Sequence, residues 1–156
     1  MNRIEKPVSA SRTEQVQIIG QKDLNGYQRL FGGRLLEWID TVAGVVARRH
    51  AGMNVTTALI DSLEFCRAAY ANDTIVLSGH ITWVGRSSME VCVQTYVEAL
   101  DGRRELINKA HIIMVALDEN ERPAPAPALK IETAQEQAEW DMAVERKRLR
   151  ARGQKE

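Results

Sequence analysis

The spacing of hydrophobic residues changes twice along the chain and divides it into a helix, a set of strands and a second helix. From Arg34 to Arg49, apolar residues recur at intervals of three and four, which predicts a helix with one broad apolar face. That face consists of Leu35, Leu36, Ile39, Val42, Ala43 and Val46. Gly52 is the expected end of this helix. So wide an apolar face predicts that other elements wrap around the helix.

After this helix the hydrophobic period becomes two, which predicts four long strands. They are expected at residues 55–65, 74–83, 89–97 and 106–117. Short turns join them, and Asn72 is expected to adopt the left-handed conformation in one of these turns. A short alternation from Val16 to Ile19 predicts an additional edge strand. Long strands joined by short turns indicate an antiparallel sheet.

These elements together predict the α+β class, with a curved antiparallel sheet wrapped around one long central helix. Residues 1–14 are polar and mixed in charge, and are expected to form a flexible tail before a domain at 15–129. Residues 130–156 return to helical spacing, with acidic residues first and basic residues last, an order that suits the helix dipole. They predict a charged C-terminal helical extension.

A sheet of this kind has an exposed edge, and exposed edges need protection. The third and fourth long strands, or the first, are therefore expected to pair with a second copy of the chain across a two-fold axis. The sequence predicts a homo-oligomer with a dimer as its minimal unit. A trimer of dimers and a tetramer both remain open.

Composition narrows the classes of partner. The 156 residues fit one domain, and 21 basic residues balance 21 acidic ones, which argues against bulk attraction to nucleic acid or to an anionic membrane. No secretory signal or bilayer-spanning run of about 20 apolar residues is visible. We therefore expect a cytoplasmic protein without membrane insertion, nucleic-acid partner or metal. Cys66 and Cys92 are expected to be reduced core thiols.

Asp40 is the first candidate for chemistry, because it is a single carboxylate at the border of an otherwise apolar helical face. Such a position allows partial desolvation, and an unpaired carboxylate there would cost stability. A structural pairing with an arginine is the alternative interpretation. The histidines at 50, 80 and 111 look structural, and Trp38 is expected to belong to the core rather than to a pocket wall.

The segment Asn-x-x-x-x-Leu-Phe-Gly-Gly-x-Leu-Leu-x-Trp-Ile-Asp, here Asn25 to Asp40, resembles the hot-dog fold acyl-CoA thioesterases, and in particular the cytosolic acyl-CoA hydrolases. The hairpin Gly-Arg-Ser-Ser-Met-Glu, which begins at Gly85, resembles the same family. The resemblance covers residues 16–128. Members of this family usually carry glycine three residues after the loop asparagine, where this chain has Gln28.

The resemblance implies a hot-dog fold and hydrolysis of acyl-CoA to fatty acid and coenzyme A, with coenzyme A as part of the substrate and no separate cofactor. It implies that Asp40 acts as general base or nucleophile and that Asn25 serves the Asp40 of the other subunit. Gly32 and Gly33 precede the helix, where free backbone N–H groups and the helix dipole suit a thioester oxygen. Thr57 resembles a residue that lines the site.

The hairpin residues Arg86, Ser87 and Ser88 resemble the segment that holds the nucleotide and pantetheine parts of coenzyme A, and Arg67 is a further candidate for phosphate. Two other functions compete with hydrolysis. The first is a non-catalytic acyl-CoA sensor on the same fold. The second is a dehydratase, which would need a histidine near Asp40, and no histidine lies between Gln15 and Arg49.

Overall fold

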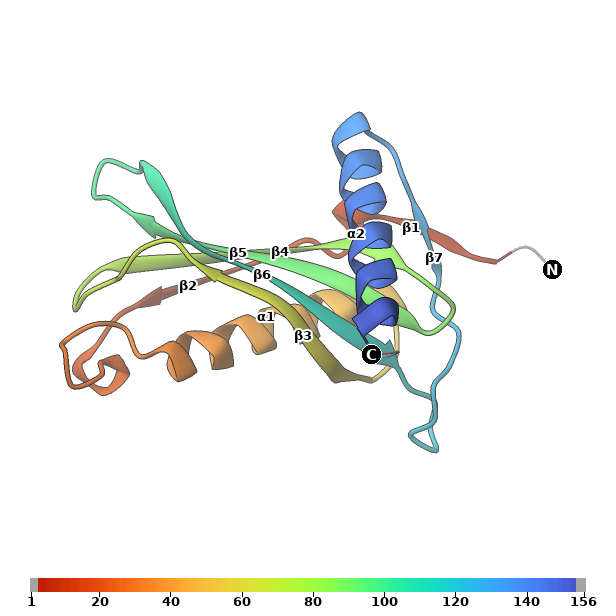
Figure 1. The fold of residues 1–156 in the computed structure, drawn as a ribbon, viewed down its shortest axis with the longest axis horizontal. Coiled ribbons are helices and arrows are strands. Elements are labelled where there is room, and N and C mark those ends of the chain that lie inside the picture. Colours follow the sequence, from red (N-terminus) through yellow and green to blue (C-terminus); the bar gives the residue numbers. More distant parts are fainter. Residues whose placement is uncertain (1–2, 154–156) are drawn as a thin grey trace.

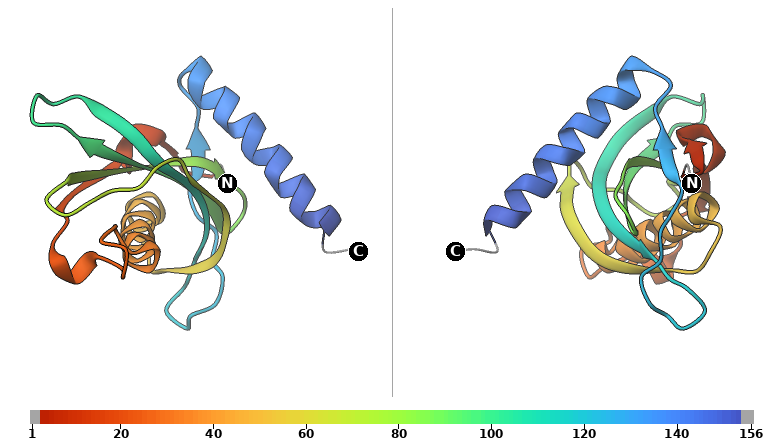
Figure 2. Two further views of the ribbon diagram at one scale, coloured as in Figure 1. Left: turned by 60° about the vertical axis from the view of Figure 1, so that its left-hand side comes forward. Right: turned by 90° about the vertical axis from the view of Figure 1, so that its right-hand side faces the viewer.

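The computed structural model describes residues 3–153, and its main layer is an antiparallel sheet of five strands in the order β2-β4-β5-β6-β3. The strands are β2 (Thr13–Ile18), β3 (Val55–Phe65), β4 (Thr74–Val84), β5 (Ser88–Glu98) and β6 (Arg104–Ala116). The helix α1 (Gly32–Ala51) lies inside the curve of this sheet, as Figures 1 and 2 show. The predicted α+β hot-dog arrangement of a central helix in a curved sheet is confirmed.

The core lies between α1 and the concave face of the sheet. Ile39, Val42 and Val46 of α1 are fully buried there against strands β4, β5 and β6. A Cβ atom built on Gly79 of β4 would lie 2.7 Å from Cγ1 of Val42, so only glycine allows the helix to approach the sheet this closely. Trp38 packs against the same core, as predicted.

The local conformations of the turns agree with the sequence. Gly52 ends α1 in the left-handed conformation at φ 68°, and its N–H donates to the carbonyl oxygen of Arg48. Asn72 has φ 69°, as predicted for its turn. Gln28 also lies in the left-handed region at φ 62°. The loop therefore keeps a conformation that glycine adopts readily, although a glutamine stands there.

The N-terminal segment differs from the prediction of a flexible tail. Residues Glu5–Pro7 form β1, which pairs in parallel with β7 (Ala128–Lys130), and two 3-10 turns, η1 (Val8–Ala10) and η2 (Gln21–Asp23), flank β2. The sequence gives too little periodicity to show this, because three-residue strands carry no recognisable pattern. The pairing joins residues 123 positions apart, which only the tertiary fold brings together.

The C-terminal helix α2 (Ala134–Gly153) crosses the convex face of the sheet, on the side away from α1 (Figure 2). Among its residues only Ala143 is buried, and the Trp140 ring packs against Trp83 of β4 at 6.0 Å between ring centroids. Ion pairs also join the helix to the strands, for example from Arg150 to Asp61 at 2.6 Å between Nη1 and Oδ2.

The order of the strands decides between the alternatives for edge pairing. β5 and β6 lie in the interior of the sheet with neighbours on both sides, which excludes the third and fourth long strands as free edges. β2 and β3 are the two edges, and most of β3 is exposed. Of the two cysteines, Cys92 is buried as predicted, whereas Cys66 is exposed just after β3, so the prediction of a core thiol there is wrong.

Candidate active site

Asp40 and Thr57 meet at the surface where α1 passes beneath β3. The Thr57 Oγ1 hydroxyl donates a hydrogen bond of 2.7 Å to Oδ1 of Asp40. Both residues are exposed, so the partial desolvation expected for Asp40 is not seen in the single protomer. Within residues 3–153 the carboxylate forms no ion pair, and Arg34, the nearest arginine in sequence, binds Asp23 and Glu37. The alternative of a structural pairing with an arginine is therefore not observed.

A β-bulge sets the position of Thr57. Thr57 pairs with Met114 of β6, and the register then shifts before Leu59, so one residue of β3 is left over. The hydroxyl of Thr57 also lies 3.4 Å from the Met114 sulfur. A carboxylate is a much stronger acceptor than a thioether, so this hydroxyl is committed to Asp40. Bulges of this kind often orient side chains beside active sites.

Asp40 lies in a groove between α1 and the ends of β3 and β6. The cavity measures about 570 Å³. Gly44, Val45, Met114 and Leu117 supply an apolar lining. Arg48, Asn54, Asp118, Glu119 and Glu121 line it as well and give it polar and charged walls. A cavity of this size is typical of small-molecule sites.

Asn25 lies in the loop before α1 and uses its side-chain oxygen to shape that loop. Its Oδ1 accepts hydrogen bonds from the backbone N–H groups of Tyr27 at 2.8 Å and Arg29 at 3.2 Å. Because the oxygen is occupied, the Nδ2 group is the free end of the amide. Asp23, which is buried and binds the Arg34 guanidinium at 3.1 Å, anchors the start of the same loop on α1.

Gly32 and Gly33 form the first turn of α1, where Phe31 caps the helix without a side-chain hydrogen bond. Their N–H groups make no backbone hydrogen bond within the described chain, whereas those of Arg34 and Leu35 both donate to the carbonyl of Phe31. A Cβ atom on Gly33 would lie 2.6 Å from the Phe31 ring. Two free donors therefore project from the positive end of the helix dipole.

The predicted site residues fall into two groups in one protomer. Asp40 follows Gly32 by eight residues, which is about 12 Å along the helix axis. Asp40 and Thr57 thus form one group, and Asn25, Gly32 and Gly33 form another at the N-terminal end of α1. The first group alone lines the groove.

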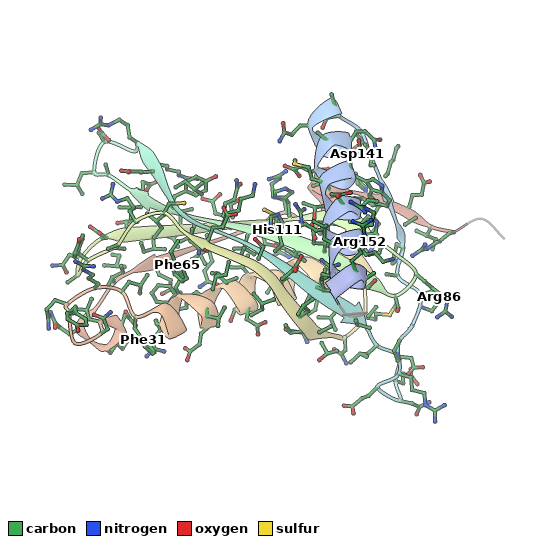
Figure 3. The ribbon with its side chains drawn as sticks, in the orientation of Figure 1. Phe31, Phe65, Arg86, His111, Asp141 and Arg152 are labelled. Carbon is green, nitrogen blue, oxygen red and sulfur yellow. The ribbon has the colours of Figure 1, made fainter. Side chains whose placement is uncertain are left out.

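The four residues predicted to bind coenzyme A do not lie together. Arg86, Ser87 and Ser88 join β4 to β5 at one end of the sheet, and Figure 3 shows Arg86 at the opposite end from Phe31 and Phe65. The Arg86 side chain is exposed, and Arg3 reinforces the hairpin by donating to the carbonyls of Gly85 and Arg86. Arg67 follows Phe65 at the far end and is paired with Glu105.

The sequence did not predict a polar network between α2 and the convex face of the sheet. At its centre, the buried Glu90 carboxylate accepts hydrogen bonds from Thr82 and Arg146. His111 is buried beside it (Figure 3), and desolvation lowers its pKa to about 4. His80 bonds to Glu139 at 2.7 Å, and His50 lies 2.7 Å from the carbonyl of Pro127. All three histidines are buried, and none lines the groove that contains Asp40.

Two negative findings complete the description. Over residues 3–153, no group of three or more His, Cys, Asp or Glu side chains is arranged to hold a metal ion. None of the helices described there is long and apolar enough to cross a membrane.

Comparison with known proteins identifies the family to which a chain with this fold and groove belongs. Residues 27–100 match the model of the thioesterase superfamily. The uncharacterized acyl-CoA thioester hydrolase YkhA of Bacillus subtilis is 40% identical over 125 residues, which are 80% of this chain and 73% of that protein. The chain belongs to the hot-dog family of acyl-CoA thioester hydrolases. It spans only 36% of the longer cytosolic acyl coenzyme A thioester hydrolase of rat, at 28% identity.

Solved structures agree with this assignment. A hexameric acyl-CoA thioesterase superimposes with a TM-score of 0.91 at 37% identity, over 96% of both chains. The acyl-CoA hydrolase of Staphylococcus aureus, solved with butyryl coenzyme A and coenzyme A, has a TM-score of 0.90 at 30% identity, over 97% of this chain and 93% of that one.

Variants of the Staphylococcus aureus enzyme have also been solved. In them an aspartate, an asparagine or a threonine is replaced by alanine. The three replaced residues have the same spacings along their chain as Asn25, Asp40 and Thr57 have here.

Proposed function

We propose that this protein hydrolyses the thioester of fatty acyl-CoA to a free fatty acid and coenzyme A, with Asp40 as general base or nucleophile. One observation carries the proposal: Thr57 holds one oxygen of the Asp40 carboxylate, and Oδ2 stays free in a groove of about 570 Å³. A carboxylate that joins two elements for structure, such as Glu90, has both oxygens bonded and its charge paired.

In the general-base route, Oδ2 takes a proton from water while the water oxygen attacks the thioester carbonyl carbon. The carbon–sulfur bond then breaks, and the coenzyme A thiolate takes the proton that Asp40 holds. In the nucleophilic route, Oδ2 itself attacks the thioester carbonyl carbon, the carbon–sulfur bond breaks and the coenzyme A thiolate leaves. Water then hydrolyses the mixed anhydride at the Asp40 carboxyl carbon. Single-turnover hydrolysis in ¹⁸O-labelled water separates the two routes, because only the second leaves label in Asp40.

The developing oxyanion needs hydrogen-bond donors beside Asp40, and the hydroxyl that contacts Asp40, that of Thr57, is already committed to the carboxylate. The N–H groups of Gly32 and Gly33 and the Nδ2 group of Asn25 are suitable donors. They lie at the other end of α1, so a second copy of the chain must bring them to Asp40.

Antiparallel pairing of β3 with the β3 of a second copy would provide this arrangement. Such a pairing places the end of β3 that carries Phe65 beside the end that carries Thr57. Phe65 accompanies the N-terminus of α1, since a Cβ on Gly32 would lie 3.9 Å from its ring. Each Asp40 would then face Gly32, Gly33 and Asn25 of the neighbouring copy. The exposed apolar residues of β3, Leu59, Leu63 and Phe65, would be covered in the same step.

We assign the hairpin Arg86, Ser87 and Ser88 to the phosphates of coenzyme A, because it presents an exposed guanidinium at the groove's end of the sheet. Arg67 lies too far from Arg86 to join it within one protomer. Its phosphate role would require the hairpin of a second copy. Higher assembly of dimers is consistent with the hexameric relative.

The test is release of free thiol from a panel of short- to long-chain acyl-CoAs by the wild type and by Asp40→Asn and Asn25→Ala variants. We expect hydrolysis by the wild type and strong loss in both variants. Mixing the two inactive variants in equal amounts should restore about a quarter of the wild-type sites. About half of the dimers are then mixed, and one of the two sites in each mixed dimer keeps both residues. Full activity of Asp40→Asn would refute the mechanism.

The alternative function is a non-catalytic acyl-CoA sensor. It predicts saturable binding without turnover of any chain length, so the same panel with a binding measurement decides between the two. A dehydratase is disfavoured because no histidine is among the groove-lining residues of the described chain.

A further inference from the structure

The groove that contains Asp40 continues beyond it into a second cavity of about 710 Å³. The two cavities share Arg48, Asn54, Leu117, Asp118 and Glu119, so they form one path. The second cavity ends at Ala124 and Pro125. The adjacent Ala126 N–H donates to the carbonyl of Arg86, and the Ala116 N–H donates to that of Ser87. The path therefore leads from Asp40 toward the hairpin at residues 85–88.

Arg48 lines both cavities at their junction, and its guanidinium is available to a ligand. It lies on α1, eight residues and about 12 Å beyond Asp40 and one turn beyond Gly44. Among residues 3–153 its side chain has no hydrogen bond or ion pair in the structure, although it is exposed and lines both cavities. The neighbouring Arg49 points elsewhere and donates to Thr13 Oγ1 at 3.1 Å.

The wall of this junction is also acidic, with Asp118 and Glu119 lining both cavities and Glu121 lining the first, although Asp118 Oδ1 already accepts from the N–H groups of Asn120 and Arg122. Three carboxylates would repel a phosphate, and an aliphatic chain would gain nothing from charged walls. A neutral chain that carries amides fits better, because its carbonyls accept from a guanidinium and its N–H groups donate to carboxylates. The pantetheine arm of coenzyme A is such a chain, with two amides and one hydroxyl.

We propose that Arg48 binds an amide carbonyl of the pantetheine arm at the junction of the two cavities, between the thioester at Asp40 and the phosphates at the Arg86 hairpin. This assignment rests on the proposed function. It makes Arg48 a binding residue for the part of the substrate that all acyl-CoAs share. The acyl chain then leaves Asp40 in the other direction, along the β3 edge that faces the second copy, so the contact of Arg48 is independent of chain length.

The experiment compares acyl-CoA with the matching acyl-pantetheine, which lacks the nucleotide and its phosphates. Loss of a hydrogen bond from a charged donor should raise KM about tenfold for both substrates in Arg48→Ala, with little change in kcat. Arg48→Gln keeps an amide donor and should lose less. Arg86→Ala should raise KM for acyl-CoA alone. Arg49→Ala, one residue away and outside the path, is the matched control and should change neither KM.

Three results would overturn the assignment: no change in KM with Arg48→Ala, an increase for acyl-CoA but not for acyl-pantetheine, or an effect that varies with acyl length. Binding of the products coenzyme A and pantetheine supplies a readout that does not need turnover, and Arg48→Ala should weaken both to a similar extent. A wild type that hydrolyses no acyl-CoA would refute the proposed function, while these product affinities would still test Arg48.

Discussion

Two carboxylates on opposite faces of the sheet show how differently this fold treats the same chemical group. Asp40 of α1 lies on the concave side, exposed, with one hydrogen bond from a neutral hydroxyl. Glu90 of β5 lies on the convex side beneath α2, and its residue is 1% exposed. Its Oε1 accepts from Thr82 at 2.6 Å, and the Arg146 guanidinium binds both carboxylate oxygens, at 2.7 and 3.1 Å.

These surroundings set what each carboxylate can do. Burial alone would raise the pKa of Glu90, but the hydrogen bonds from Arg146 and Thr82 hold it below its usual value. With its oxygens occupied and its charge paired, Glu90 can only hold α2 to the sheet. Asp40 has an open oxygen and a cavity before it, which is what water or a thioester needs. Solvent access to a carboxylate oxygen, rather than negative charge, therefore distinguishes Asp40 from Glu90.

Asp40→Asn should give the largest effect, a loss of activity of about 10³-fold, because a neutral amide neither accepts the proton of water nor attacks a carbonyl. The free energy of unfolding should change by less than about 0.5 kcal/mol, since the residue is exposed. Steady-state thiol release and urea denaturation measure the two quantities. A large loss of stability in this variant would indicate that Asp40, like Glu90, holds elements of the fold together.

Glu90→Gln should give the reverse pattern, with a loss of about 4 kcal/mol in the free energy of unfolding. The reason is that the Arg146 guanidinium, part-buried beneath α2, would lose its counter-charge. Glu145→Gln is the control, because that carboxylate is exposed on the same helix and pairs with Arg148. It should leave the free energy of unfolding nearly unchanged, because solvent screens an exposed ion pair. Equal losses in both variants would contradict a special role for the Glu90 network.

Acidification should lower the stability of the protein through His111 on the convex side of the sheet. Desolvation lowers the pKa of His111 to about 4 in the folded state, although nearby Glu90 and Asp61 oppose the shift and Arg146 and Lys109 add to it. The unfolded chain therefore binds this proton more tightly, and stability should fall by on the order of 2 kcal/mol as the pH drops from about 6.5 to 4.

His111→Asn should flatten that part of the stability curve in urea titrations at several pH values. Below about pH 4.5 a further loss should remain, because Glu90 and Glu139 also have lowered pKa values and lose stabilisation when protonated. A variant with the wild-type slope between pH 6.5 and 4 would show that His111 does not control it.

Thr57→Val should give the smallest effect, a roughly tenfold loss of kcat with near-normal stability, because the valine keeps the shape but cannot orient Asp40. Thr57→Ser keeps the hydroxyl and should retain most of the activity. The pair of variants, measured by thiol release, separates the hydrogen bond from the side-chain volume. Equal losses in both would indicate that packing against Met114, rather than the hydroxyl, matters.

Much of the fold was predictable because local patterns specify local structure. The period of apolar residues gave α1 and the four long strands to within a few residues, and Gly52 and Asn72 adopt the backbone conformations expected of them. The sequence also singled out Asp40, since one carboxylate on an apolar helix is conspicuous. The Thr57 hydrogen bond, by contrast, joins residues on different elements and has no local signal.

Local patterns in the sequence therefore specify which segments are helix and strand, where the chain turns and which carboxylate is conspicuous. Contacts formed in the folded chain make β3 an edge and β5 and β6 interior strands, place Arg67 and Arg86 at opposite ends, and bury Glu90 beneath α2. The two kinds of information differ in how far apart the interacting residues lie in the chain. Periodicity and turn conformation depend on neighbouring residues, whereas strand order and solvent access depend on contacts between residues far apart in the chain, such as Glu90 and Arg146.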